Sequence, residues 1–219
     1  ATTVYAFADG VKWLQGMMKQ FCGDTAFPIY YEVIKPGQTG VIYEDDSLTV
    51  EVFPLYHRVA ATGYIFREKP KLLHVNGDMI RFHDVPRWQI VEIKKGMDFV
   101  KPDGTVVPNS YLTMPSEPAM SYAYASDTLA DSRVAKAVEG VDVLYHEATY
   151  DDSQEALARD RGHSTAGQAA RIAAQAGVGR LVLGHFSKRY LSEDLMLEQA
   201  RAIFPNTIAA NEGMRINLL

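Results

Sequence analysis

The stretch from Ser126 to Tyr190 decides the fold of this 219-residue chain. It contains the runs Val143-Leu144-Tyr145-His146-Glu147-Ala148-Thr149, Gly162-His163-Ser164-Thr165 and Leu183-Gly184-His185-Phe186-Ser187-Lys188-Arg189-Tyr190. Each run is either an apolar strand or the entry to a helix, and each carries an ionisable residue where that element ends or begins. Because strand ends and helix starts meet at one edge of an α/β sheet, we expect these residues to converge on a single site.

Strands and helices alternate on both sides of this stretch. Strands are predicted at residues 3–7, 29–34, 40–43, 48–55, 63–66, 122–126, 141–145, 180–183, 207–210 and 215–218. Helices are predicted at residues 10–21, 132–138, 151–161, 164–176 and 192–204. The expected class is a mixed α/β sandwich in which strands pack between helices.

The composition is that of an ordinary globular domain. Apolar residues make up 47% of the chain and the formal net charge is -5, which argues against nucleic-acid binding by the overall field. No apolar run approaches the roughly 18 residues of a membrane span, so no membrane association is expected. The single cysteine, Cys22, excludes an internal disulfide, suits a reducing cytoplasm and is expected to be a buried apolar residue.

Residues 68–96 break the alternation and are predicted to be an insertion that projects from the body. Residues 67–101 carry eight basic and five acidic side chains, a net charge of +3. Trp88–Ile93 is expected to return toward the body as a ribbon. A basic insertion on an acidic body suits a phosphate-rich partner, and an ordinary solvated surface explains the charges equally well.

Three residues that follow apolar strands form a candidate metal set. His57, Asp127 and His185 each lie just beyond a predicted strand, and imidazole with carboxylate is a ligand combination that suits zinc. A single histidine or aspartate at such a position more often makes a structural hydrogen bond, but three at equivalent positions favour a metal. Three ligands are too few for a site that holds two metal ions.

The residues around His163 indicate acid–base chemistry. Thr165 and Gln168 fit a capping box, which explains both of them structurally. His163 lies beside a helix N-terminus that also favours phosphate oxygens. A buried carboxylate such as Glu147 could orient it as a general acid, although a structural acid is an equally good reading of Glu147. His146 is expected to face the other side of its strand.

The motifs Pro54-Leu55-Tyr56-His57-Arg58, Ser126-Asp127-Thr128, His146-Glu147-Ala148-Thr149, His163-Ser164-Thr165 and His185-Phe186-Ser187-Lys188-Arg189-Tyr190 resemble those of the ribonuclease Z family. This family of tRNA 3′-processing endonucleases belongs to the metallo-β-lactamase superfamily. The resemblance implies that residues 1–219 form a metallo-β-lactamase-type αββα sandwich whose N-terminal part is missing. It also implies that residues 68–96 are a protruding arm that grips the tRNA.

The resemblance implies a role for each motif residue. His57 and Asp127 would bind one zinc ion, and Asp127 and His185 a second. Glu147 and His163 would form the proton-donating dyad. Ser164, Thr165 and Arg189 would contact the substrate phosphates, and the enzyme would act as a homodimer. The family's His-x-His-x-Asp-His zinc motif is absent from these 219 residues, so this chain alone is expected to be inactive.

The leading hypothesis is therefore a zinc-dependent endoribonuclease that removes the 3′ trailer from tRNA precursors, with this chain as its C-terminal portion. A phosphodiesterase of the same fold that acts on small substrates is a second hypothesis. A non-catalytic remnant that binds RNA or a protein partner is a third. The basic insertion separates the first two, because only a tRNA-cleaving enzyme needs it.

Overall fold

The computed structural model describes residues 1–217, and the chain divides into two compact units. The first contains Ala1–Glu44, Thr49–Arg67 and the residues from Ser121 onward. The second contains Asp45–Leu48 and Glu68–Met120. The candidate site residues all lie in the first unit.

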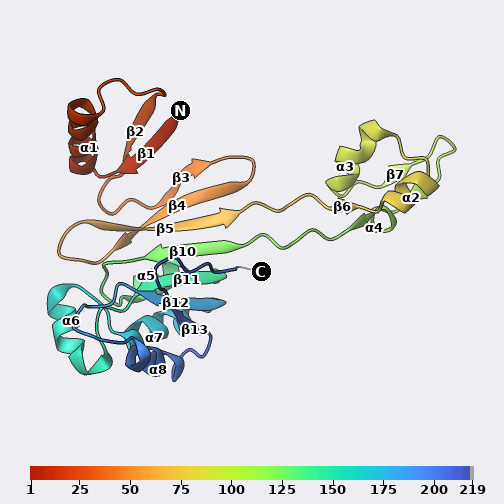
Figure 1. Cartoon of the computed structure of the whole chain (residues 1–219). Helices are drawn as coiled ribbons and strands as arrows, with labels where there is room; N and C mark the ends of the chain where they lie inside the picture. Colours follow the sequence, from red (N-terminus) through yellow and green to blue (C-terminus); the bar gives the residue numbers. More distant parts are fainter. Residues whose placement is uncertain (218–219) are drawn as a thin grey trace. The chain divides into compact units, whose positions relative to one another are not determined.

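The first unit is built on a seven-stranded sheet in the order β13-β12-β11-β10-β5-β4-β3 (Figure 1). Its strands are β3 (Gly40–Glu44), β4 (Leu48–Leu55), β5 (Ala61–Glu68), β10 (Ser121–Ala125), β11 (Val143–Glu147), β12 (Arg180–Gly184) and β13 (Thr207–Ala209). Neighbouring strands from β10 to β13 are parallel, whereas β5 runs antiparallel to β10 and β3 antiparallel to β4. The C-terminal ends of β10, β11 and β12 therefore lie at the same edge.

Helices cover one face of this sheet. They are α5 (Ser132–Ala137), α6 (Glu155–Arg161) with the short helix η2 (Asp152–Gln154) before it, α7 (Ala166–Ala176) and α8 (Asp194–Arg201). Alternate strand residues such as Ala123, Leu144 and Leu181 point into one core with the alanine-rich face of α7. The predicted capping box of Thr165 and Gln168 is confirmed at the start of α7. The capping box fixes where the helix begins and thereby places His163 just before it.

A smaller element precedes the large sheet. Strands β1 (Thr2–Ala6) and β2 (Ile29–Val33) pair in parallel, and α1 (Ala8–Phe21) connects them. Cys22 is exposed, so the expectation of a buried cysteine is wrong. It follows the last turn of α1, a helix that buries only Val11.

The predicted strand at residues 215–218 is not formed over residues 215–217, and Leu218 lies outside the described residues. A turn closed by the bond from Met214 N to Asn211 O comes directly before it. Most side chains there are exposed, so little apolar surface is buried to hold a strand in place.

The second unit has its own small core of Val85, Ile93, Phe99, Val107 and Leu112. Its elements are β6 (His74–Val75), α2 (Gly77–Phe82), η1 (Arg87–Gln89), α3 (Ile90–Lys94), β7 (Phe99–Val100), β8 (Val106–Val107), α4 (Asn109–Leu112) and β9 (Thr113–Met114). The Asn109 side chain donates to the carbonyls of Ile93 and Met97, which ties α4 to the end of α3. We call this unit the arm unit.

The arm unit extends beyond the predicted insertion of residues 68–96, because β6 pairs with β9 near residue 114. Trp88–Ile93, expected as a ribbon, is helical; Ile90 and Ile93, three residues apart, share the face that meets the core. Residues 68–120 contain seven basic and seven acidic side chains and so are neutral. The arm unit exposes two large aromatic side chains, because Trp88 is 76% and Phe82 75% exposed.

None of the helices among the described residues is both long enough and apolar enough to span a bilayer.

Candidate active site

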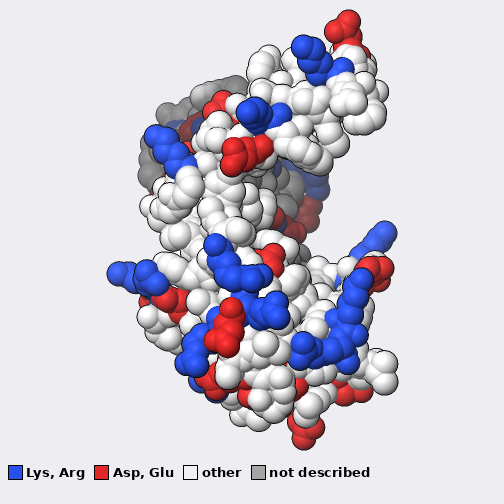
Figure 2. Space-filling view, turned by 90° about the vertical axis from the view of Figure 1, so that its left-hand side faces the viewer, with Lys and Arg blue, Asp and Glu red and all other residues white. Residues whose placement is uncertain are grey.

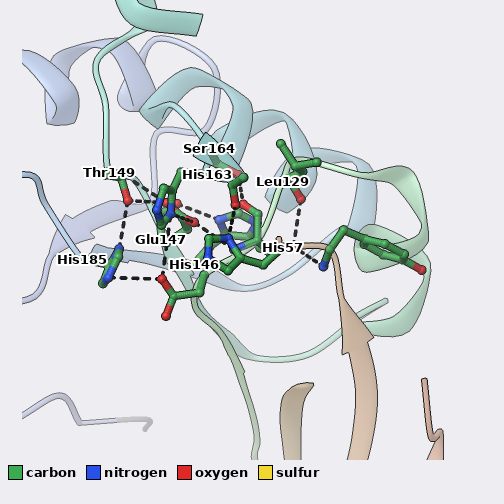
Figure 3. A network of polar contacts seen from close by, with 12 residues as sticks. His57, Leu129, His146, Glu147, Thr149, His163, Ser164 and His185 are labelled. Atoms are coloured by element: carbon green, nitrogen blue, oxygen red, sulfur yellow. Dashed lines mark hydrogen bonds and ion pairs between the residues drawn. The ribbon is translucent and has the colours of Figure 1, made fainter. Parts of the chain in front are cut away.

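The predicted site residues lie beyond the ends of β4, β10, β11 and β12 and just before α7. His57 follows β4, Asp127 follows β10, Glu147 ends β11 and His185 follows β12. The His163 ring lies 4.9 Å from that of His57 and 5.4 Å from that of His185, centre to centre. The expected convergence of these histidines is confirmed, and Figure 3 shows them in one network.

Asp127 and His185 share an uncommon backbone conformation. Their φ angles are 58° and 59°, in the left-handed region that non-glycine residues rarely occupy. Asp127 is the second residue after the end of β10, and His185 is the first residue after the end of β12. The turn aims both side chains at each other, with His185 Nε2 3.3 Å from Asp127 Oδ1. Strain of this kind persists where a site requires it.

Glu147 is fully buried and accepts four hydrogen bonds. Its Oε1 receives the backbone N–H of Thr128 at 2.8 Å and His163 Nδ1 at 2.7 Å. Its Oε2 receives the N–H of Thr149 at 3.2 Å and the Thr149 hydroxyl at 2.5 Å. Burial alone would raise the pKa of this carboxyl, but the hydrogen bonds, that from His163 first, outweigh it and lower the pKa.

His163 is the partner of Glu147 and is held by it. The carboxylate raises the pKa of the His163 imidazole mainly through their hydrogen bond, against a smaller opposing effect of burial. Because Nδ1 is bonded to Glu147, Nε2 is the nitrogen left for another group. A histidine with a raised pKa and one free nitrogen can hold a proton for transfer.

His57 is fixed by the backbone of Gly162. Its Nδ1 donates to the Gly162 carbonyl at 2.8 Å, so its Nε2 keeps a lone pair. Gly162 has a φ of 81°, and a Cβ on it would come within 2.6 Å of His57 Nδ1. Only glycine satisfies both the backbone conformation and the close approach of the imidazole.

We expect Gly162→Ala to displace His57 and to destabilise the chain more than Gly177→Ala does. Gly177 also has a positive φ, 62°, but a Cβ there meets nothing within 4 Å. Gly177→Ala should cost about 1–2 kcal/mol for the left-handed backbone alone, and Gly162→Ala that amount plus the displacement. Thermal unfolding of both variants and the NMR shifts of the His57 ring are the measurements. Equal losses with an unmoved His57 ring would contradict this reading of Gly162.

Four residues offer ligand atoms that could hold a metal ion. One atom each from Asp127, Glu147, His163 and His185 lie within 4.8 Å of one another. Glu147 and His163 are bonded to each other, which leaves Asp127 and His185 as the freer donors. His57, also predicted as a ligand, is not in this group; its ring lies beside that of His163, tilted by 49°.

The predicted substrate residues are placed differently from one another. The Ser164 side chain is fully buried and donates to the Thr128 carbonyl at 2.7 Å. The Thr165 hydroxyl is occupied by its capping bond, and both hydroxyls thus have internal partners. Arg189 is exposed and lies over the Tyr150 ring at 5.0 Å, and that ring is 6.2 Å from His163. Figure 2 shows Lys and Arg side chains, with acidic side chains among them, on the face that it draws.

The sequence reading missed several residues that complete the site. Thr149 bonds both Glu147 and His185, and the Thr128 backbone holds Glu147. His146, expected to face away from the site, is fully buried; burial lowers its pKa, and its Nδ1 bonds the Glu147 carbonyl at 2.7 Å. In the chain, His146 and Thr149 are within two residues of Glu147, and Thr128 directly follows Asp127; these positions were the available signal.

Comparisons with known proteins agree on a family. Residues 110–186 match the model of a beta-lactamase superfamily domain. The chain is 45% identical over 205 residues to the ribonuclease Z of Bacteroides fragilis, covering 94% of this chain and 67% of that protein. It is 40% identical to the ribonuclease Z of Phocaeicola vulgatus, covering 98% of this chain and 70% of the relative. The chain thus spans about two thirds of the length of these relatives.

Solved structures show the same fold. Human tRNase Z, short form, matches with a TM-score of 0.60 at 18% identity, covering 99% of this chain and 68% of the other. A metallo-beta-lactamase fold protein from Bacillus subtilis matches with a TM-score of 0.59 at 17% identity, covering 97% and 64%. The expected α/β metallo-β-lactamase fold is confirmed, over part of the length of these structures.

Proposed function

The chain belongs to the ribonuclease Z family of the metallo-β-lactamase superfamily, and from this we propose that it supplies part of a zinc-dependent endoribonuclease that removes the 3′ trailer from tRNA precursors. One observation carries the proposal. The bonded pair of Glu147 and His163 lies beside the pair of Asp127 and His185, with His163 Nδ1 3.9 Å from Asp127 Oδ1. A proton donor and a metal-binding pair within one site suit phosphodiester hydrolysis.

The donor set fits zinc. His185 Nδ1 is bonded to the Thr149 hydroxyl, and its Nε2 faces the Asp127 carboxylate at 3.3 Å. A metal cation bound by both the Nε2 lone pair of His185 and the Asp127 carboxylate oxygen would satisfy both groups. Asp127 and His185 would hold one zinc ion in this proposal, and Asp127 with His57 Nε2 a second. Bound zinc would supply an activated water and neutralise charge on the phosphate.

His163 would act as the general acid. Its raised pKa keeps a proton on the imidazole at higher pH than an ordinary histidine does. Glu147 holds Nδ1, so Nε2 would deliver the proton to the departing 3′ oxygen of the RNA chain. The ionised Glu147 stabilises the positive charge of the imidazolium before transfer.

The exposed guanidinium groups would bind the RNA phosphates. Arg189 lies over Tyr150 next to His163, and Arg58 is close enough to His163 to oppose the rise in its pKa. Arginine binds phosphate through two parallel hydrogen bonds. The hydroxyls of Ser164 and Thr165 and the Thr165 N–H are bonded internally, so the proposed phosphate contact at the start of α7 would come from the Ser164 backbone N–H.

The arm unit would bind the body of the tRNA. Residues 68–120 carry no net charge, so exposed aromatic side chains would contribute more to tRNA binding than charge would. Trp88 and Phe82 are both about three-quarters exposed, and stacking of one base on such a ring contributes about 1–3 kcal/mol. A homodimer in which the arm of one subunit serves the other is part of the same proposal; the mass of the particle in solution tests it.

In a chimera that joins this chain to the part of the Bacteroides fragilis ribonuclease Z outside the alignment, replacing residues 69–119 with a short Asn-Gly turn is expected to abolish tRNA binding and to spare hydrolysis of a small chromogenic phosphodiester. Glu68 N donates to Met120 O at 2.9 Å, so the two ends are already paired and a hairpin turn can join them. Filter binding and hydrolysis assays on the same preparation are the measurements.

Trp88→Ala is the matched control, expected to weaken tRNA binding without changing hydrolysis of the small ester. Undiminished tRNA binding after removal of the arm unit would contradict the assignment of the tRNA contact to this unit.

The function is tested in a chimera that joins to this chain the part of the Bacteroides fragilis ribonuclease Z left uncovered by the alignment. With zinc, the chimera should release the 3′ trailer from a tRNA precursor, and the Asp127→Ala chimera should not. A chimera that folds and binds zinc but hydrolyses only small esters would overturn the assignment to tRNA.

A further inference from the structure

Thr149 lies between the two halves of the candidate active site. It follows β11 by two residues and is 7% exposed. Its hydroxyl oxygen is 2.5 Å from Glu147 Oε2 and 2.9 Å from His185 Nδ1 (Figure 3). Its carbonyl accepts the N–H of Ser187 at 3.2 Å, which ties it to the loop that carries His185. One side chain therefore touches both the acid dyad and a proposed zinc ligand.

The hydrogen atoms in this contact can be assigned from the chemistry of the groups. An ionised carboxylate only accepts hydrogen bonds, and a threonine hydroxyl has one hydrogen to give. A separation of 2.5 Å is that of a charge-assisted O–H···O⁻ bond, so the hydroxyl hydrogen points at Glu147. The oxygen can then only accept from His185, and His185 must carry its hydrogen on Nδ1.

This assignment decides which nitrogen of His185 is free. With the hydrogen on Nδ1, the lone pair is on Nε2, the atom 3.3 Å from Asp127 Oδ1. In water a neutral histidine side chain can place its hydrogen on either nitrogen, and the partner of one nitrogen selects the tautomer. Second partners of this kind orient metal-binding imidazoles and raise their basicity.

We propose that Thr149 is a positioning residue that fixes His185 in the Nδ1–H tautomer, presents Nε2 toward Asp127 as a metal ligand, and joins that ligand to the general acid through Glu147. The inference rests on the proposed function only in treating His185 as a ligand. Because the same Glu147 binds Thr149 on Oε2 and His163 on Oε1, a change at the ligand is transmitted to the acid through one carboxylate.

The other two histidines of the site follow the same rule with other partners. Nδ1 of His57 donates to the Gly162 carbonyl, and Nδ1 of His163 bonds Glu147. All three imidazoles thus keep Nε2 for the site. His185 differs because its partner is a hydroxyl, which can be removed by a substitution that preserves side-chain shape.

The test uses the 219-residue chain with ¹⁵N-labelled histidine, observed by long-range ¹H–¹⁵N NMR well above the ordinary histidine pKa of about 6.5. His185→Gln assigns the resonances. In the unsubstituted chain and in Thr149→Ser, His185 is expected as the Nδ1–H tautomer. In Thr149→Val, which keeps the shape and loses the hydroxyl, the Nε2–H tautomer should appear.

An Nε2–H tautomer in the unsubstituted chain, or an unchanged one in Thr149→Val, would overturn the proposal. The signals of His146, which is fully buried in the first unit, show whether each variant is folded. If Thr149→Val fails to fold, the tautomer of His185 in the unsubstituted chain and in Thr149→Ser still tests the proposal, because both are expected to show Nδ1–H.

Zinc affinity gives a second readout. Thr149→Val should bind zinc about 10–100-fold more weakly than Thr149→Ser, the range found when the outer partner of a metal ligand is removed. Equal zinc affinities of Thr149→Val and Thr149→Ser would contradict the proposed role of the Thr149 hydroxyl in positioning His185. Neither measurement needs RNA cleavage, so a chimera that fails to cut tRNA would refute the proposed function and leave this inference standing.

Discussion

Glu147→Gln is expected to lower the free energy of unfolding of the chain by about 3–5 kcal/mol, the cost of leaving one partner of a buried ion pair alone. The Glu147 side chain is fully buried and surrounded by donors from Thr128, Thr149 and His163. Glutamine offers one acceptor oxygen in place of two, and its NH₂ group would face donors that need an acceptor. For a chain of this size the melting temperature should fall by roughly 6–20 °C.

Thermal and urea unfolding of Glu147→Gln and of Glu139→Gln give the comparison. Glu139 is exposed, so its substitution should change stability by no more than about 0.5 kcal/mol. Similar stabilities of the two variants would mean that the Glu147 network contributes little to the fold.

The loss in Glu147→Gln should also depend on pH. The folded state lowers the pKa of Glu147, so its contribution is present above the unfolded value near 4.5 and is lost as pH falls through the folded pKa. The folded state raises the pKa of His163, so that contribution is complete below 6.5 and is lost as pH rises through the folded pKa. The difference between the unsubstituted chain and the variant should be largest between about pH 4.5 and 6.5.

His163→Ala in the chimera is expected to slow cleavage of a tRNA precursor by about 10²–10⁴-fold, the contribution of a general acid. Zinc content should not change, because His163 is bonded to Glu147 and is not assigned as a ligand. Single-turnover cleavage and metal analysis of the same samples are the two measurements.

Glu139→Ala, at an exposed position of the first unit, controls for the loss of an ionisable side chain outside the site. Unchanged cleavage by His163→Ala would remove the dyad from the mechanism. A loss of zinc together with activity would instead make His163 a ligand, which its place in the four-residue group allows.

The sequence predicts the position of the site better than its internal geometry. His57, Asp127 and His185 could be predicted because each follows an apolar strand, and parallel strands end at a common edge. The left-handed backbone of Asp127 and His185 could not, because nothing in the residue types requires it. Thr149 was missed because its importance comes from a contact with His185, 36 residues later in the chain.

The arm unit shows a different limit of sequence reading. Charge and weak periodicity mark where it begins, but its end depends on the pairing of β6 with β9, for example of His74 with Met114, 40 residues later. Helix α3 was read as a ribbon because a five-residue helix is too short to establish a clear helical period. Within such short segments, tertiary packing decides between helix and strand.

The proposed function requires Asp127 and His185 to form a metal-binding pair beside the dyad of Glu147 and His163. Crystals of the chain soaked in zinc, with data collected at the zinc absorption edge, test it most directly. An anomalous peak is expected about 2.0–2.2 Å from His185 Nε2 and from an Asp127 carboxylate oxygen. Zinc peaks at other sites, with none between Asp127 and His185, would contradict it.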